Sequence, residues 1–466
     1  MVYPAKYPPV INGENWNAMV DAANGMIIAS GVTIQYPFSY VIRNVGGVYD
    51  AVNGNGVLTY GGSSDAGGID GDNAAAVIQA AINATADGTI YLKKGRYILT
   101  SPLTLVDKNI ILAGDGWGRI YDSGNETGTI LVKQYSDAAA YFITVTHTED
   151  NIGVFSIRDL AILCDKTTYT GGGIYVNGAF INEGWELSNL RIRGFTLPCL
   201  KVEDAGKHTL RKLYVSLCDD FPIYYDGCGD WQWYDVEADI GGATDKAGAG
   251  LFSTTGQIIG GHFEGFRGIY AQASTLELLG AKIVATNRSG IYLSGCNWVT
   301  IMGCAIANPN RDNQASDGSG VTVYNSTYVH VLGNKIVDVS TPHYMRYAVQ
   351  EVGASCLNNV YKDNIIEGNI AAPFSLQATD TIIENGNSGF RVSKSGVTTI
   401  TGAHTSGNIN HGLYDTPTGI HVTVTDNADD KSVTYYLYGI TSTKFTVDTL
   451  TDGNYTIRWT AFYNPI

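Results

Sequence analysis

The chain has 466 residues, of which 44% are hydrophobic and only 16% charged, a composition that indicates a folded protein with a large core. Its net charge of −15 argues against nucleic acid or an anionic membrane surface as partner, because both need basic patches. An acidic polysaccharide is still open as a ligand, since a local patch could be basic.

The beginning of the chain, MVYPAKYPPVING, lacks a signal-peptide pattern, and no run of about 18 apolar residues occurs, so membrane insertion is not expected. We expect a protein that acts outside the cell or on a virus particle, exported by a removed signal or by another route. Residues 1–45 read as a small adaptor or linker, with a short helix at 16–28.

Residues 46–120 predict the start of the main domain. The apolar spacing of Val77, Ile78, Ala81 and Ile82 predicts a helix over 73–86, with Asp70 or Asp72 as its cap. A solenoid is open at its first coil and needs a cap, and an amphipathic helix can cover that end.

Between Phe155 and Gln377 the same short phrase recurs, as GGIYV, GIYA, GIYL and GVTV, with a second series such as ELSNLRI and VHVLGNKI between its members. Recurrence on this scale indicates stacked units, and the alternation of apolar and polar residues makes each unit all strand. In the unit from Gly290 to Asp317, three strands would form one coil, with Ile291 and Leu293 inward and Tyr292 outward.

The fold class predicted is therefore all-β: a right-handed parallel β-helix over residues 46–385. A sandwich of similar strands is the alternative, but a sandwich would not require the same sequence phrase to recur at such regular intervals. The pairs Gly333-Asn334 and Ser188-Asn189 fall at sharp bends between strands. The seven cysteines have no zinc spacing, so we expect buried thiols, with a Cys218–Cys228 bridge as the alternative.

Residues 46–120 also carry the most specific motifs: GIDGDNAAAVIQAAINA, then Lys94-Gly95-Arg96-Tyr97, then Gly114-Asp115-Gly116. This stretch resembles the N-terminal segment of pectate-lyase-superfamily β-helix proteins, although Lys94 stands where that family usually has Pro. The resemblance implies a fold shared by lyases, hydrolases, epimerases and viral tailspikes. It implies a homotrimer only if the chain is tailspike-like.

Residues 396–466 have strands at shorter spacing, including GIHVTVTD, SVTYYLYGI and NYTIRWTAFY, and predict a small antiparallel β-sandwich after a linker. The phrase His411 to Pro417 resembles C-terminal modules of phage tail fibres. We interpret His411 as structural, since it lies in a turn without acidic or Cys partners.

Outward residues of the recurring phrase predict a groove along one face of the solenoid. Because coils stack about 4.8 Å apart, the rings form a stripe on which sugars can pack their apolar faces. The alternative is that Tyr simply favours exposed strands. The predicted substrate-binding residues are Lys201, Tyr224, Arg267, Tyr270 and Tyr292, and Phe252 is expected at the same phrase position.

Candidate catalytic residues are the carboxylates of loops that enter this face: Asp219, Asp220, Asp245 and Glu264. Asp219-Asp220, in LCDDFPIYY, resembles an element of polygalacturonase-type glycosidases, although the other elements of that family are absent. Two crowded carboxylates cannot both ionise freely, so one could act as general acid. Glu203 and Asp226 end two of the groove strands.

Three functions compete on these residues. A glycoside hydrolase needs paired carboxylates as acid and base or nucleophile, and it is the reading we favour. A polysaccharide lyase would need a base and charge neutralisation, with Lys201, Arg193 or Arg267 serving and Ca²⁺ held by acidic loops. A non-catalytic tailspike or receptor-binding protein would need only the groove. We expect no cofactor or metal, apart from that Ca²⁺ if the protein is a lyase.

Overall fold

The computed structural model describes residues 38–462 except for 119–126, 148–153, 179–183, 240–245, 285, 314–317, 370–371, 379, 384–386, 388–392, 403–405, 411–418, 427, 429–434, 442–443 and 450–452. The helix expected at 16–28, the His411 to Pro417 phrase and Asp245 lie outside the described residues. The chain divides into two compact units, Met1–Asn287 and Arg288–Ile466, which are described separately.

The first unit opens with strands that precede its capping helix. These strands are β1 (Tyr40–Val45), β2 (Val48–Asn53) and β3 (Leu58–Gly61), which pair antiparallel in chain order. β1 lies within the range that the sequence assigned to the adaptor, yet it also pairs in parallel with β4 (Asp87–Leu92).

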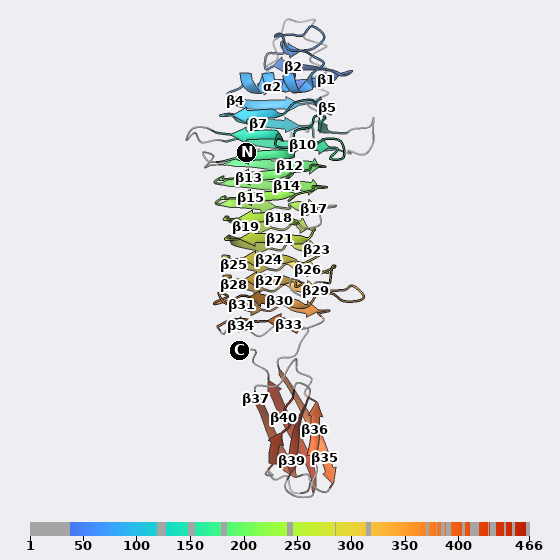
Figure 1. Cartoon of the computed structure of the whole chain (residues 1–466), viewed down its shortest axis with the longest axis vertical. Helices are drawn as coiled ribbons and strands as arrows, with labels where there is room; N and C mark the ends of the chain where they lie inside the picture. Colours follow the sequence, from blue (N-terminus) through green and yellow to red (C-terminus); the bar gives the residue numbers. More distant parts are fainter. Residues whose placement is uncertain are drawn as a thin grey trace, which may run out of the picture. The chain divides into compact units, whose positions relative to one another are not determined.

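Helix α2 (Ala74–Ala84) covers the end of this unit, packing on β2, β3, β5 (Gly95–Leu99) and β6 (Leu103–Val106) (Figure 1). Its predicted apolar face is fully buried. The predicted cap was wrong, because Asn73 is the N-cap and its side chain accepts a hydrogen bond from the Ala76 amide at 3.1 Å. Like Asp, Asn can satisfy a free amide of the first helical turn.

After this cap the first unit is a stack of parallel strands in two sheets (Figure 1). One sheet, which we call the groove sheet, contains β6 and then β9 (Tyr141–Thr146), β11 (Gly172–Asn177), β13 (Leu200–Glu203), β15 (Ile223–Asp226), β18 (Ala247–Phe252) and β21 (Arg267–Gln272). The other, which we call the back sheet, contains β4, β5, β7 (Asn109–Gly114), β8 (Thr129–Lys133), β10 (Ser156–Cys164), β12 (Trp185–Arg193), β14 (His208–Ser216), β16 (Trp231–Tyr234), β17 (Glu237–Asp239), β19 (Thr255–Ile259), β20 (His262–Phe263), β22 (Thr275–Leu279) and β23 (Lys282–Val284).

The second unit continues this pattern in its first part. Its groove-sheet strands are β24 (Ile291–Ser294), β27 (Val321–Tyr324), β30 (Tyr347–Val352) and β33 (Ala372–Ser375). Its back-sheet strands are β25 (Asn297–Met302), β26 (Ala305–Ala307), β28 (Thr327–Leu332), β29 (Lys335–Val337), β31 (Val360–Lys362), β32 (Ile365–Glu367) and β34 (Ile382–Ile383). The predicted three-strand coil is confirmed in β24, β25 and β26, with Ile291 and Leu293 buried and Tyr292 partly exposed.

Left-handed backbone angles recur at equivalent positions of successive coils, in part at residue types that tolerate them. Asn189 has φ of 50° and aligns with Asp159 and Lys212, which also have positive φ. In the second unit Gly333 takes this conformation, and the buried Asn334 after it forms a ladder with Asn364, whose side-chain oxygen accepts from the Asn334 amide at 3.0 Å. The ladder satisfies the backbone at a turn that water cannot reach.

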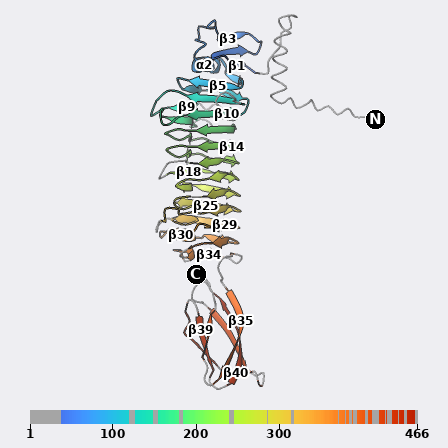
Figure 2. The same cartoon turned by 90° about the vertical axis from the view of Figure 1, so that its right-hand side faces the viewer.

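Residues 393–462 form the predicted antiparallel module, with two three-stranded sheets. One sheet has the order β35 (Ser393–Gly402), β40 (Gly453–Phe462) and β37 (Gly419–Asp426), and the other β36 (Ser406–Asn410), β39 (Lys444–Thr449) and β38 (Tyr435–Tyr438). Figure 2 labels β35, β39 and β40 of this module. Buried side chains such as Phe445 and Ile457 form its core.

The cysteines are all free thiols, six of them buried and Cys164 half-buried, so the alternative Cys218–Cys228 bridge does not form. Among the described residues, no helix is both long and apolar enough to cross a membrane.

The core of the first unit holds a buried histidine in an aromatic stack. The His208 ring lies 4.0 Å from the Trp185 ring at an interplanar angle of 10°, and its Nε2 lies 2.9 Å from the Tyr225 hydroxyl. Burial lowers the pKa of His208 to about 3. The folded protein therefore keeps this ring neutral at pH values where an unfolded chain would protonate it.

This burial predicts acid sensitivity of the first unit. The contribution of the neutral His208 ring to the free energy of unfolding is fully present above pH 6.5, the ordinary pKa of histidine. It is lost as the pH falls from there toward about 3. Between pH 7 and pH 5 the loss should be about 2 kcal/mol. Chemical unfolding followed by Trp fluorescence should show a shallower pH dependence for His208→Phe, which keeps the stack but cannot titrate. Equal pH slopes for both proteins would contradict the assignment.

Candidate functional site

The groove sheet of the first unit presents two rows of outward side chains. Strand pairing places one row along Tyr175, Lys201, Tyr224, Gly250 and Tyr270. It places the second row, two residues further along each strand, at Asn177, Glu203, Asp226, Phe252 and Gln272. The residues between the rows point inward, and Val202 and Tyr225 among them are fully buried. Each row therefore runs along the stack with one residue per coil.

Aromatic rings form a continuous cluster over β15, β18 and β21. The Tyr224 and Phe252 rings stack at 5.0 Å, and Phe252 lies 5.6 Å from Tyr270. Phe252 belongs to the second row, so the prediction that it shares the phrase position of the tyrosines was wrong. The first row has Gly250 there, where a Cβ would come within 2.7 Å of the Phe221 ring. Phe221 and Phe252 together cover the place of the missing side chain.

Lys201 lies between two tyrosines and beside a carboxylate. Its Nζ is 5.1 Å from the Tyr175 ring centroid and 5.8 Å from that of Tyr224, and it forms an ion pair of 2.8 Å with Glu203. The Tyr175 hydroxyl donates to the other oxygen of Glu203 at 2.8 Å. Burial, and after it the Glu203 carboxylate, raises the pKa of Tyr175 to about 12.

Glu203 and Asp226 are register partners on adjacent strands, both outward and partly exposed. The Tyr224 hydroxyl lies 3.4 Å from Asp226, and burial, followed by the Asp226 charge, raises the pKa of Tyr224 to about 12. Adjacent strands are about 4.8 Å apart, a spacing that is compatible with the carboxyl separation of about 5–5.5 Å found in retaining glycosidases. The sequence showed that these acids end groove strands, but it did not show their register.

The paired carboxylates of the LCDD loop point to different partners. Asp219 forms an ion pair of 2.5 Å with Lys166, whereas Asp220 lies 3.9 Å from Lys246 and accepts from the Phe221 amide at 2.8 Å. Lys246 also lies 5.3 Å from the Phe221 ring. Asp219 and Asp220 therefore interact with different lysines and do not form a carboxylate pair with a common partner.

The other predicted residues are more dispersed. Glu264, after β20, lies 3.0 Å from His262, and Arg267 begins β21 with its guanidinium 5.6 Å from the Tyr270 ring. Tyr292 lies in the second unit, where it stacks at 6.5 Å with Tyr324. The structure thus brings Lys201, Tyr224, Asp220 and Tyr270 onto one face of the first unit, together with Glu203, Asp226, Phe221 and Lys246.

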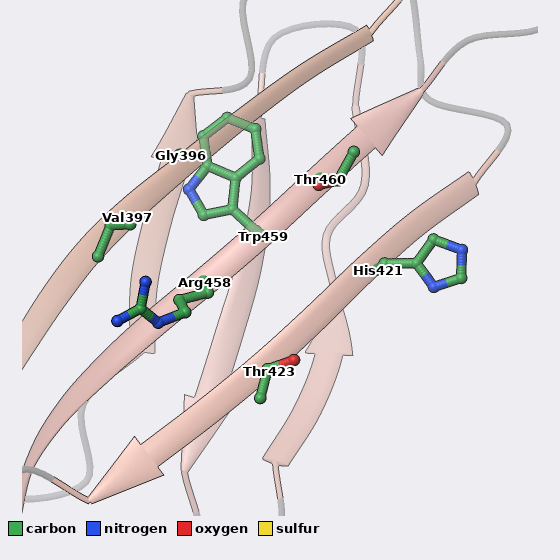
Figure 3. Close-up of a pocket in the computed structure, with 7 residues that line it drawn as sticks. All are labelled: Gly396, Val397, His421, Thr423, Arg458, Trp459 and Thr460. Carbon is green, nitrogen blue, oxygen red and sulfur yellow. The ribbon is translucent and has the colours of Figure 1, made fainter.

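A hollow of about 430 Å³ lies on the C-terminal module instead, lined by Gly396, Val397, His421, Thr423, Arg458, Trp459 and Thr460 (Figure 3). None of these lining residues has a carboxyl group, so the hollow lacks the acid that glycoside hydrolysis requires. Within the described ranges, no three His, Cys, Asp or Glu side chains gather where they could hold a metal ion.

Comparison with known proteins finds no matching family profile and no matching curated protein. Solved structures do match. The tailspike gp61 of Pseudomonas phage phi297 aligns with a TM-score of 0.53 at 11% identity, over 85% of this chain and 93% of its own. The Dettilon tailspike protein gp208 aligns with a TM-score of 0.51 at 11% identity, over 84% and 91%.

A third match is the A-module of the Azotobacter vinelandii mannuronan C-5 epimerase AlgE4, with a TM-score of 0.50 at 17% identity over 67% of this chain and 96% of that module. The protein is a right-handed parallel β-helix. At these identities the likeness shows the fold of the β-helix and leaves its chemistry to the residues of this chain.

The tyrosines of the groove give a test of the site geometry that needs no substrate. Glu203→Gln should lower the pKa of Tyr175 from about 12, while burial should keep it above its ordinary value of 10. The matched change Asp226→Asn should instead lower the pKa of Tyr224. NMR titration of labelled tyrosine ring carbons, assigned with Tyr175→Phe and Tyr224→Phe, would measure both. A Tyr175 pKa that does not respond to Glu203→Gln would show that the two groups are apart in solution.

Proposed function

We propose that the β-helix binds a polysaccharide along the groove sheet and cleaves it as a glycoside hydrolase. The observation that carries this proposal is the register pair of Glu203 and Asp226, two outward carboxylates on adjacent coils that lie beside the row containing Tyr175, Tyr224 and Tyr270. The similar solved structures include polysaccharide-active proteins by their titles, among them the mannuronan epimerase, and tailspikes.

Each group has a defined role in this proposal. Glu203, which accepts from Lys201 and from the Tyr175 hydroxyl, would attack the sugar carbon or stabilise its developing positive charge. Asp226, whose only close described polar neighbour is the Tyr224 hydroxyl at 3.4 Å, would protonate the leaving oxygen. Tyr224, Phe252 and Tyr270 would pack against the apolar faces of sugar rings, and Arg267 would hold a polar or acidic substituent.

The carboxylates favoured by the sequence, Asp219, Asp220, Asp245 and Glu264, remain candidates. Asp220 lies closest to the aromatic cluster, through its hydrogen bond to the Phe221 amide. Its contact with Lys246 suits a role in holding substrate more than one in giving up a proton. Asp219 is similarly engaged by Lys166.

A second function is a receptor-binding protein of a virion surface that binds glycan without cleaving it. The observation that favours it is that Glu203, Asp219 and Asp220 each lie beside a lysine, as expected of a binding surface. We place the protein outside the cell or on a virion in either case, and a homotrimer is the assembly we propose by analogy with the tailspikes.

The catalytic proposal is tested on a panel of polysaccharides with two readouts. New reducing ends without absorbance from an unsaturated uronate support hydrolysis, whereas that absorbance indicates a lyase. On the cleaved substrate, Glu203→Gln and Asp226→Asn should each reduce the rate about 10²–10⁴-fold, as expected for an essential acid or nucleophile. Glu277→Gln, which changes an exposed carboxylate of the back sheet, is the matched control and should change the rate little.

Measurements of glycan affinity alongside cleavage rate distinguish the remaining possibilities. Phe252→Ala should weaken glycan affinity without a matching loss of maximal rate, because the ring contacts the substrate and not the bond that breaks. Full rates in both Glu203→Gln and Asp226→Asn, with a loss in Asp220→Asn, would move the chemistry to the LCDD loop. Glycan binding with neither product signal would leave the receptor-binding function.

A further inference from the structure

Exposed apolar side chains gather on the back sheet of the second unit. Five large side chains of its long back-sheet strands and their flanks are between 36% and 58% exposed, and we call them the apolar face: Trp298, Met302, Tyr328, Leu357 and Ile382. Pairing brings them together, since β25, β28, β31 and β34 are consecutive neighbours and Thr327 bridges to Leu357. A contiguous apolar patch of this kind usually marks an interaction surface.

The same strands in the first unit show a different surface. One of their outward rows is polar and consists of Glu186, Thr209, Gln232, Gln257 and Glu277. The other contains Tyr234, Ile259 and Leu279, which are apolar but only partly exposed. Among described residues from 155 to 287, none of the large hydrophobic side chains is exposed. The apolar face is therefore confined to part of the chain and is not a general property of the back sheet.

The backbone is strained where it presents the two aromatic rings. Trp298 and Tyr328 have φ of 60° and 54°, a left-handed conformation that is rare for bulky residues. Asn358 has φ of 55° one coil later, so a residue in the left-handed conformation recurs at this position in three successive coils. The Trp298 and Tyr328 rings stack at 4.3 Å with an interplanar angle of 5°. Strain that persists in a stacked feature is a pointer to function.

We propose that the apolar face is the surface through which this chain associates with other copies of itself. Trp, Tyr and Met are enriched in the buried centres of protein interfaces, and a pre-stacked pair loses little freedom on binding. The outward ionisable groups of β25, β28 and β31 at their described positions are His330 and Lys362. One carboxylate, Asp380, lies at the edge of the face, where it accepts from the Asn358 amide at 3.1 Å. Two copies that each carry a net charge of −15 can approach most easily through such a face.

The spacing of the side chains also favours a second copy over an unrelated partner. The outward residues repeat once per coil, about 4.8 Å apart along the stack. A partner can interlock with such rows over their length only if it has the same repeat, and another β-helix has it. The inference does not depend on catalysis in the groove sheet.

The test measures the mass of the full chain in solution by light scattering and sedimentation over a range of concentrations. The wild type should be oligomeric. The double variant Trp298→Asn and Tyr328→Asn should associate at least about tenfold more weakly, as expected when interface hot spots are removed. Asn tolerates left-handed backbone angles and occurs naturally at 358, so this variant should keep the fold, which circular dichroism checks.

A matched control changes the same sheet in the first unit. Gln232→Asn with Gln257→Asn should leave the oligomeric mass unchanged, because both residues lie in the polar outward row. A monomeric wild type, an unchanged mass for the Trp298 and Tyr328 variant, or equal dissociation of the control would each overturn the proposal. Groove variants such as Glu203→Gln should not alter the mass, so failure of the proposed function remains distinguishable.

Discussion

Parallel pairing of each coil with the next, in register, is the constraint on which the rest of this structure depends. Because the backbone hydrogen bonds run between coils, residues at equivalent positions stack directly above one another. A polar residue that points inward therefore needs a partner in its own coil or the next. His208 meets this condition with Trp185 and Tyr225, and Asn334 meets it with Asn364.

Stacking also creates the surface that we propose to be functional. Outward side chains become rows rather than isolated groups, so Tyr175, Lys201 and Tyr224 touch although the chain between them runs through entire coils. The groove needs no cavity in the ordinary sense, because a chain-like ligand can lie along a row. The hollow on the C-terminal module, which is open to solvent, has no carboxyl group among its lining residues.

The two solenoid faces show how one architecture can separate tasks. The groove sheet of the first unit and its loops combine rings with carboxylates and lysines, and Asp219, Glu203 and Asp220 each lie beside a lysine. The back sheet of the second unit instead exposes Trp298 and Tyr328 with few charges. Charged rows suit a polar ligand that exchanges with water, whereas an apolar row gains most when it is permanently covered.

The sequence by itself determined the coil, the capping helix and the C-terminal sheets. Alternation along GIYL gave the buried Ile291 and Leu293, and helical spacing gave the buried face of α2, because these patterns depend only on local geometry and on the burial of apolar groups. Free cysteines were predicted because they lie mostly within strand phrases and lack zinc spacing, and all seven are free thiols.

Only the tertiary structure decided which outward residues meet. The position of Phe252 one row away from Tyr224, the separate lysines of Asp219 and Asp220, and the pairing of Glu203 with Asp226 all depend on register between coils. Loops of unequal length set that register, and a shift of two residues exchanges one row for the next while the inward pattern is unchanged. The inward pattern was therefore readable from the sequence, whereas the composition of the site was not.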